Sequence, residues 1–515
     1  MLMKKNHLLA TMKTCLLLSA GMFLASCAQD GFEKESFVGT YPGFQLTTPD
    51  ASTVTVKASS DKQSQTITWD AINGAGTYTV NVFQGDTPDE CTNVIAKDRV
   101  TKVNYVTIPR IDKTYYYITI KVNDNIPEGN TAPEGITTFK WNTYTIDLGV
   151  IPAGSDIAAF FKANPIPVSY RGSDITYTLE AGGQYEISDT VDVDGFMFNL
   201  VSEDENNPAK VTFKANEEGS KPKVAFCVGG GLGLKYIDFD CTNLDGAFIL
   251  LSKKPVETPV KVNAWNTDYY FYQISEPISV ISCNIDNLNS FFLTDASFGT
   301  NGVWFPTTVL IDDCVVHLTT STNNNNYAYF YTNNGGGFIK EMTVRNSTFY
   351  NTTEFGYRYF VRYGGFGISE AQKAFGWEET KLSYENCTFY NVCQNDGQWG
   401  NYNGIYGKPT SFWVMTNCIF WNCSTSGSVP RRFLHGKDYA SNPENKTFLN
   451  NTYMKADGTF QDPQTYDTSG TNIEEDPHFA NPANGDFHIS GSKQATLGTG
   501  DPRWLPKYNH QLKSI

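Results

Sequence analysis

A short motif recurs along the second half of the chain and limits the folds open to it. Its copies begin roughly 30 to 40 residues apart, a period typical of solenoids and other repeat arrays. Each copy reads as a short strand, with a small residue, an inward apolar residue and a polar turn residue. The copies are Ser282-Cys283-Asn284-Ile285, Asp313-Cys314-Val315-Val316, Asn346-Ser347-Thr348-Phe349, Asn386-Cys387-Thr388-Phe389, Asn417-Cys418-Ile419-Phe420 and Asn450-Asn451-Thr452-Tyr453.

One copy cannot bury its apolar residue alone, so we expect the copies to stack as coils, with like residues over like. This predicts a right-handed parallel β-helix over residues 143–505. A β-propeller has blades of similar length, but the segments between these copies vary too much for regular four-stranded blades. The pairs expected to stack are Cys387 with Cys418, Phe389 with Phe420, Asn391 with Asn422, and Cys393 with Cys423.

Residues 43–142 show a different pattern, in which strands of period two are separated by Gly, Asn and Pro. The alternation predicts an antiparallel sandwich. The arrangement of Trp69, the Gly-Ala-Gly turn and Tyr78-x-Val80 resembles a fibronectin type III domain, which implies a spacer role. The fold class predicted for the whole chain is therefore all-β, a fibronectin type III-like sandwich followed by the β-helix.

A brief helical pattern over residues 155–162 separates the two regions. Ser155 is the expected N-cap. A short amphipathic helix at this point would cover the first coil of the β-helix, which otherwise presents unpaired backbone groups.

The first 26 residues have the basic start and short apolar run of a signal peptide. The run ends in Leu24-Ala25-Ser26-Cys27, which resembles the lipobox of bacterial lipoproteins. The resemblance implies cleavage before Cys27, lipidation of its thiol and attachment to the outer membrane, with exposure at the cell surface. Residues 27–42 are then a tether, and residues 506–515 are a C-terminal tail.

The composition of the chain limits the classes of partner that it can bind. The formal net charge is −15, which argues against binding nucleic acid. Nine cysteines remain after Cys15 and Cys27, and because this number is odd they cannot all pair. None forms a CxxC motif, so most are expected to be small buried hydrophobic residues rather than metal ligands.

The C-terminal region adds a more specific signature. Glu475-Asp476-Pro477-His478-Phe479, Asn484-Gly485-Asp486-Phe487-His488-Ile489 and Gly500-Asp501-Pro502-Arg503-Trp504 follow the last coil. Together with the lipobox, the sandwich and the N-C-x-F coils, they resemble Bacteroides-type lipoproteins of the DUF4957 and DUF5123 families. The resemblance implies a fold related to pectate lyases and chondroitinase B. It also implies a role in glycan utilisation, with other outer-membrane glycan-uptake proteins as partners.

In a β-helix, equivalent strands of consecutive coils line one groove. In this chain we expect that groove 11 to 17 residues after the small residue of each copy. These positions hold aromatic residues, which can stack on sugar rings, and cations, which bind carboxylate or sulfate. The predicted substrate-binding residues are Tyr327, Tyr329, Tyr331, Trp399, Tyr402 and Arg431, and the predicted catalytic residues are Arg358, Arg362, Arg432 and His435. The alternative is that Tyr357–Tyr363 is a strand with one packed face and one solvated face.

Three functions stay open at this point. The first is a surface protein that binds an acidic polysaccharide, and the second is a lyase that cleaves a uronate-containing glycan. The third is an adhesin or structural surface protein. No cofactor is expected. Asp238-x-Asp240 places two carboxylates on one side of a strand, and Asp312-Asp313 points them to opposite sides. Both patterns are ordinary at turns and solvated faces, so calcium is an alternative that these residues do not support.

Overall fold

The computed structural model describes residue 43 and residues 45–59, 63–216, 218–252, 258–295, 301–320, 324–332, 336–394, 396–402, 410–434, 445–462 and 466–506. The chain divides into two compact units, and the boundary along the sequence lies between Tyr144 and Thr145. Cys27 and His435 lie outside the described residues. Within the described part of the chain, no helix is long and apolar enough to cross a membrane.

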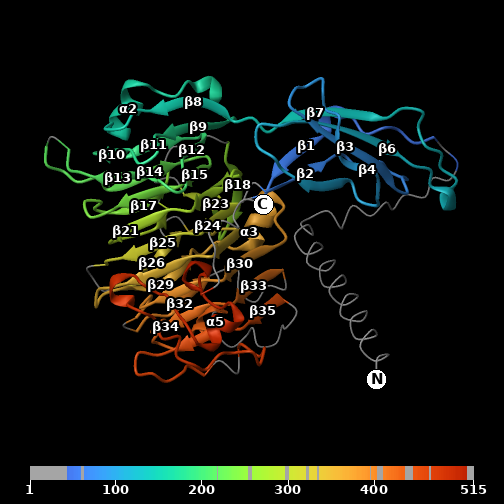
Figure 1. The fold of residues 1–515 in the computed structure, drawn as a ribbon. Coiled ribbons are helices and arrows are strands. Elements are labelled where there is room, and N and C mark those ends of the chain that lie inside the picture. Colours follow the sequence, from blue (N-terminus) through green and yellow to red (C-terminus); the bar gives the residue numbers. More distant parts are fainter. Residues whose placement is uncertain are drawn as a thin grey trace, which may run out of the picture. The chain divides into compact units, whose positions relative to one another are not determined.

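The first unit is an antiparallel two-sheet sandwich, as the period-two pattern predicted (Figure 1). Trp69 and Tyr78 are buried between its sheets, with their rings edge to face at 5.3 Å. One sheet has the order β1 (Thr55–Ala58), β2 (Ser64–Thr68), β5 (Tyr105–Pro109), and the other has the order β4 (Asn93–Thr101), β3 (Tyr78–Gly85), β6 (Tyr115–Val122), β7 (Thr137–Asn142).

The second unit is a parallel β-helix, which confirms the fold predicted from the repeats. In its described residues three long parallel sheets run along the stack of coils (Figure 1). The ten-stranded sheet contains β8 (Ile146–Ile151), β9 (Asp174–Leu179), β12 (Met197–Ser202), β15 (Leu232–Lys235), β20 (Ile278–Ile281), β24 (Thr308–Asp312), β27 (Glu341–Arg345), β30 (Thr380–Glu385), β33 (Ser411–Thr416) and β35 (Lys446–Leu449).

The other two long sheets complete each coil. The nine-stranded sheet contains β10 (Gln184–Ile187), β13 (Ala209–Phe213), β16 (Ile237–Asp240), β21 (Asn284–Leu288), β25 (Val315–Leu318), β28 (Thr348–Asn351), β31 (Thr388–Tyr390), β34 (Ile419–Trp421) and β36 (Thr452–Met454). The seven-stranded sheet contains β11 (Val191–Asp194), β14 (Val224–Val228), β17 (Ala247–Leu251), β22 (Leu293–Thr294), β26 (Asn324–Thr332), β29 (Tyr357–Tyr363) and β32 (Trp399–Tyr402).

A small sheet and several short helices lie outside the three long sheets. A three-stranded sheet is formed by β18 (Val260–Ala264), β19 (Thr267–Ile274) and β23 (Gly302–Pro306). Helix α2 (Ile157–Ala163) contacts β10 and β11 and so covers the first coils, as expected. Its N-cap is Asp156 rather than the predicted Ser155, because the Asp156 carboxylate accepts hydrogen bonds from two backbone amides of the first turn. The other helices are α3 (Ile368–Phe375), α4 (Val429–Phe433) and α5 (Lys493–Leu497).

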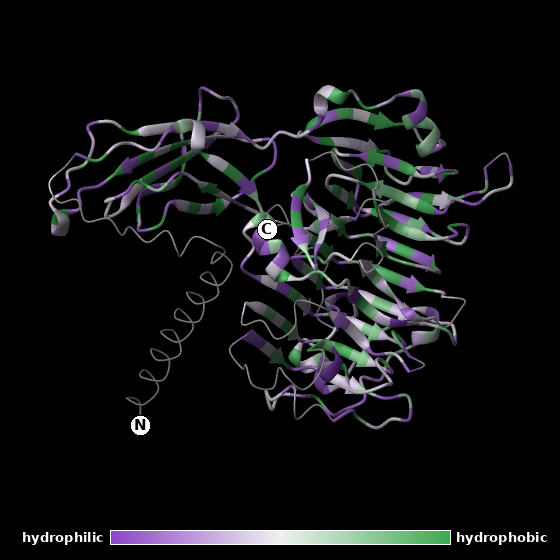
Figure 2. Ribbon diagram, turned by 180° about the vertical axis from the view of Figure 1, so that it is seen from behind, coloured by the Kyte–Doolittle hydropathy of each residue, from purple (hydrophilic) through white to green (hydrophobic). Residues whose placement is uncertain are grey.

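The interior of the β-helix consists of like residues in register, and its strands alternate hydrophobic and hydrophilic residues (Figure 2). Phe389 lies over Phe420 with ring centroids 5.0 Å apart and an interplanar angle of 9°. The nine described cysteines are free thiols, and most are buried, as predicted. The predicted Asn391–Asn422 pair is also present, with a hydrogen bond of 2.8 Å between the two side-chain amides.

A second row of asparagines joins the ten-stranded sheet to the nine-stranded sheet. Asn346, Asn386, Asn417 and Asn450 all have positive φ, a conformation that asparagine tolerates better than most residues. Their side-chain amides bond from coil to coil, at 3.4 Å, 3.1 Å and 3.2 Å. The row therefore satisfies polar groups at a sharp turn that every coil must make.

Asn417 lies in the middle of this row and offers a test of it. Asn417→Ala removes two side-chain hydrogen bonds and leaves alanine at a φ of 53°, so we expect a loss of about 2 kcal/mol in the free energy of unfolding. Asn417→Gly also removes the two hydrogen bonds, but glycine adopts positive φ without strain, so this variant should lose less unfolding free energy than Asn417→Ala. Urea denaturation measures both; equal losses in the two variants would contradict a role for the backbone conformation.

Candidate functional site

The structure brings three of the four predicted segments onto neighbouring strands of the seven-stranded sheet. Strand β29 lies between β26 and β32, with Arg362 in register with Tyr331 on one side and with Asn401 on the other. The fourth segment is not a strand. It forms helix α4, which packs against β32 and holds Arg431 and Arg432.

Four predicted sugar-binding residues are wrong as surface residues. Tyr329, Trp399 and Tyr402 are fully buried, Tyr331 is only 5% exposed, and Trp399 stacks on Phe360 at 4.8 Å inside the coils. The offset count gave a position along each strand but not the face of the strand toward which each side chain points. Register shifts between Asn324 and Ala328 and between Tyr359 and Val361 change which side chains face inward.

The predicted residues Tyr327, Tyr331 and the four arginines, together with Tyr359, form what we call the Arg–Tyr face. Ala328, Tyr331 and Tyr359 make a hydrophobic cluster separate from the interior core, and Tyr327 at its edge is 37% exposed. The Arg362 guanidinium lies 5.8 Å from the ring centroid of Tyr331 and 5.5 Å from that of Tyr359. The members of the face are Tyr327, Tyr331, Tyr359, Arg358, Arg362, Arg431 and Arg432.

Helix α4 extends the positive charge of this face. Burial, together with the nearby positive charges of Arg431 and Arg358, lowers the pKa of Arg432. The Arg432 Nε donates a hydrogen bond of 2.9 Å to the backbone carbonyl of Ser426, which fixes the direction of the side chain. Three guanidinium groups thus lie close enough to repel one another, an arrangement that a bound anion would stabilise.

The arginines of the face have no acidic partner in the described residues. None of the ion pairs found there includes Arg358, Arg362, Arg431 or Arg432. The Nε atoms of Arg358 and Arg362 are buried without a hydrogen-bond acceptor, although Arg362 also donates to the Asn326 carbonyl. A buried donor without an acceptor is costly, so this face can accept a negatively charged ligand.

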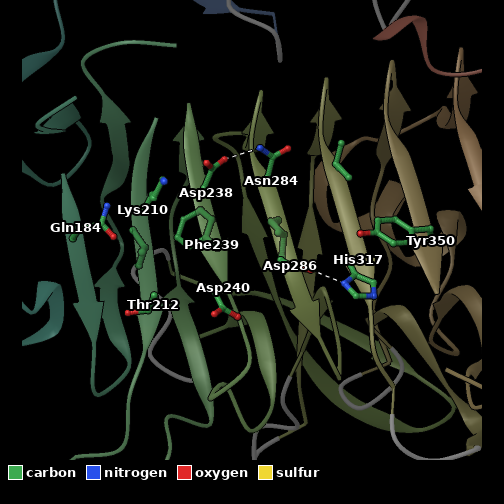
Figure 3. Close-up of a pocket in the computed structure, with 13 residues that line it drawn as sticks. Gln184, Lys210, Thr212, Asp238, Phe239, Asp240, Asn284, Asp286, His317 and Tyr350 are labelled. Atoms are coloured by element: carbon green, nitrogen blue, oxygen red, sulfur yellow. Dashed lines mark hydrogen bonds and ion pairs between the residues drawn. The ribbon is translucent and has the colours of Figure 1, made fainter. Parts of the chain in front are cut away.

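A separate groove of about 380 Å³ lies on the outer face of the nine-stranded sheet (Figure 3). Two rows of polar side chains border it, because residues two apart on a strand point the same way. The first row is Gln184, Lys210, Asp238 and Asn284, and the second is Thr212, Asp240, Asp286, His317 and Tyr350. Asp238 and Asp240 thus share one side of β16, as the sequence indicated.

Contacts between neighbouring coils fix these side chains. Asn284 donates a hydrogen bond of 2.6 Å to Asp238, and the His317 Nδ1 lies 2.5 Å from an Asp286 carboxylate oxygen (Figure 3). The imidazole stacks on Tyr350 at 4.5 Å. Burial raises the pKa of Asp238, and burial likewise raises the pKa of Tyr350 to about 12.

The C-terminal segment sets one end of this groove. Phe487 packs against Tyr350 with ring centroids 5.3 Å apart, and it packs against Tyr390 on the next strand at 5.5 Å. Beyond this point Tyr390 stacks on Trp421, so the outer face continues as an aromatic row under the C-terminal segment. The groove is therefore open over β10 to β25 and ends at β28.

Our sequence analysis missed the groove as a whole, although the repeats contain its signal. From β16 on, the turn residue before each strand of the nine-stranded sheet has positive φ, and in the groove the fourth residue after it faces outward. This offset leads from Tyr236 to Asp240, from Ser282 to Asp286, from Asp313 to His317 and from Asn346 to Tyr350. In the described residues, no group of three or more His, Cys, Asp and Glu side chains could hold a metal ion.

Three family models match successive parts of the chain, and each is described as a domain of unknown function. DUF4992 matches residues 3–187, DUF4957 matches residues 183–352 and DUF5123 matches residues 382–504. The DUF4957 and DUF5123 models both match segments of the β-helix. The segment matched by DUF4957 holds the groove, whereas the segment matched by DUF5123 holds Arg431 and Arg432 of the Arg–Tyr face; Arg358 and Arg362 lie between the two matched segments.

Among solved structures, the chain is similar to an alginate lyase and to pectate lyases. The PL6 family alginate lyase AlyGC matches with 13% identity and a TM-score of 0.32, over 59% of this chain and 36% of the lyase. The pectate lyase PelI of Erwinia chrysanthemi in complex with tetragalacturonic acid matches with 10% identity and a TM-score of 0.17, over 77% and 99%. The chain thus spans about a third of the length of the alginate lyase. No curated protein matches the chain.

Proposed function

We propose that this protein binds an anionic polysaccharide on the Arg–Tyr face. The observation that supports this most directly is the set of four arginines without a described acidic partner, in a chain whose formal net charge is −15. Arginine donors match carboxylate and sulfate groups, and the exposed ring of Tyr327 beside them supplies a surface for a sugar ring. A glycan lying across the strands meets one coil after another, about 4.8 Å apart.

The test is a binding panel. The chain from residue 28 to 515 is titrated with alginate, polygalacturonate and chondroitin sulfate, and with uncharged dextran as the control. Saturable binding of at least one anionic polymer, weakened by added salt because salt screens charges, is the expected result. Equal binding of dextran, or no binding of any anionic polymer, contradicts the proposal.

A lyase is the second candidate, and the position of Arg432 beside Arg358 and Arg431 favours it. Elimination requires a base that removes the proton next to the uronate carboxylate, while the bond from the sugar ring to the leaving oxygen breaks, a carbon–carbon double bond forms and the leaving oxygen takes up a proton. Burial and the two neighbouring arginines lower the pKa of Arg432, which is the direction that a base requires. Ultraviolet absorbance of the unsaturated product, lost on Arg432→Ala but not on Lys455→Ala, would identify elimination; an unchanged rate in Arg432→Ala would exclude this base.

We further propose that the chain is tethered to the outer membrane through Cys27 and works beside other glycan-uptake proteins. The lipobox residues Leu24 to Cys27 support this proposal. Mass spectrometry of the mature N-terminus should find a lipidated Cys27, and Cys27→Ser should release the protein from membranes. An unmodified N-terminus at another residue would contradict the tether.

A further inference from the structure

The groove on the nine-stranded sheet has the form of a site for a linear polymer. Its lining residues come from six neighbouring strands, β10, β13, β16, β21, β25 and β28. Strands in a sheet lie about 4.8 Å apart, so the groove is roughly 24 Å long and runs across the strands. A chain-like ligand lying along it would pass both polar rows on β13, β16 and β21.

The chemistry of the two rows identifies the kind of ligand. Carboxylate oxygens of Asp238, Asp240 and Asp286 accept hydrogen bonds, and the Asn284 amide and the Lys210 ammonium group donate them. Hydroxyl groups, which both donate and accept, match such a mixture. Burial raises the pKa of Asp238, so part of this carboxyl group is already shielded from water beside Asn284.

The charge of the groove separates its ligand from that of the Arg–Tyr face. Three aspartates border it against one lysine, and one of the aspartates is paired with His317 at 2.5 Å. Uronate or sulfate groups would meet net negative charge there, and like charges at close range are costly. The two surfaces also belong to different sheets of the β-helix.

We propose that this groove binds an uncharged saccharide chain through its hydroxyl groups. The carboxylates of β16 and β21 accept from the hydroxyls, and Asn284 and Lys210 donate to them. Tyr350 and the C-terminal Phe487 close one end, so the saccharide enters from the β10 side. The inference is independent of the function proposed for the Arg–Tyr face.

The test uses residues 28–515 and calorimetric titration with β-1,4-linked gluco-, manno- and xylo-oligosaccharides and with an α-1,4-linked gluco-oligosaccharide. We expect saturable binding of at least one, weakened about tenfold or more by Asn284→Ala and by Asp238→Asn. Glu205→Gln, an exposed acid in the turn between β12 and β13, is the matched control and should leave binding unchanged.

Two further measurements keep the result decisive. Lys210→Gln changes an exposed side chain, so its effect on affinity cannot be attributed to unfolding, and thermal melting of every variant checks this directly. Arg362→Ala should leave oligosaccharide binding intact, which separates this site from the Arg–Tyr face. No binding by any of the four oligosaccharides, or binding indifferent to Asp238→Asn and Asn284→Ala, overturns the proposal.

Discussion

Arg362→Ala is expected to weaken binding of an anionic polysaccharide by about 10- to 100-fold, the equivalent of one lost charge-assisted hydrogen-bonding group. The Arg362 guanidinium lies 5.8 Å from the Tyr331 ring centroid and 5.5 Å from that of Tyr359, and its Nε has no acceptor in the described structure. Its Nη1 donates a hydrogen bond to the Asn326 carbonyl, so the guanidinium group is held in place before any ligand binds. A ligand that completes its hydrogen bonds loses little side-chain entropy in doing so.

Two variants separate charge from geometry at this position. Arg362→Lys keeps the positive charge but lacks the planar fork, so it should recover only part of the affinity. Arg99→Ala removes an exposed arginine of the sandwich and should change affinity little. Affinity measured at two salt concentrations completes the test; if Arg99→Ala weakened binding as much as Arg362→Ala, net charge rather than this face would explain it.

The fold could be predicted because the sequence motif that specifies it is repeated along the chain. The N-C-x-F copies fix which residues stack, and the structure places Phe389 over Phe420 and joins Asn391 to Asn422 accordingly. Because the motif is repeated, the inward or outward direction assigned to a residue in one copy is supported by the equivalent residue in the next copy. The helix N-cap was misplaced by one residue, because Ser155 and Asp156 are both good caps and only the backbone geometry decides between them.

The site was less predictable for a physical reason. A single bulge reverses which side chains face the core, and β26 and β29 both have irregular register toward the neighbouring strand. Trp399 and Tyr402 therefore lie inside, while Arg358 and Arg362 stay half-exposed. The groove lies on strands that pair without such an irregularity from β13 to β16 and from β16 to the start of β21. From β16 on, counting four residues from the turn residue with positive φ would have located the groove.

Arg503→Ala is expected to lower the free energy of unfolding by about 3–5 kcal/mol, because it leaves buried carboxylates without their counter-ion. Arg503 contacts Asp313 at 2.9 Å and Asp501 at 2.9 Å, and all three side chains are largely buried. Asp501 also accepts a hydrogen bond of 2.8 Å from Thr348. This group thus fastens the C-terminal segment to β28 and to the turn before β25.

The pH dependence of this loss tests its cause. Burial raises the pKa of Asp501 to about 6, even though Arg503 lowers it. The folded-state value is above the unfolded one of about 3.9, so protonation of Asp501 favours the folded state, and this contribution disappears as the pH rises through about 6. Without Arg503 the carboxyl is still easier to protonate, so the destabilisation in Arg503→Ala should be smaller at acidic pH than at pH above 7. Chemical denaturation across this range measures it, with Arg171→Ala, an exposed ion-pair arginine, as the control. A loss that did not vary with pH would mean that lost packing, and not the unpaired charge of Asp501, destabilises the C-terminal segment.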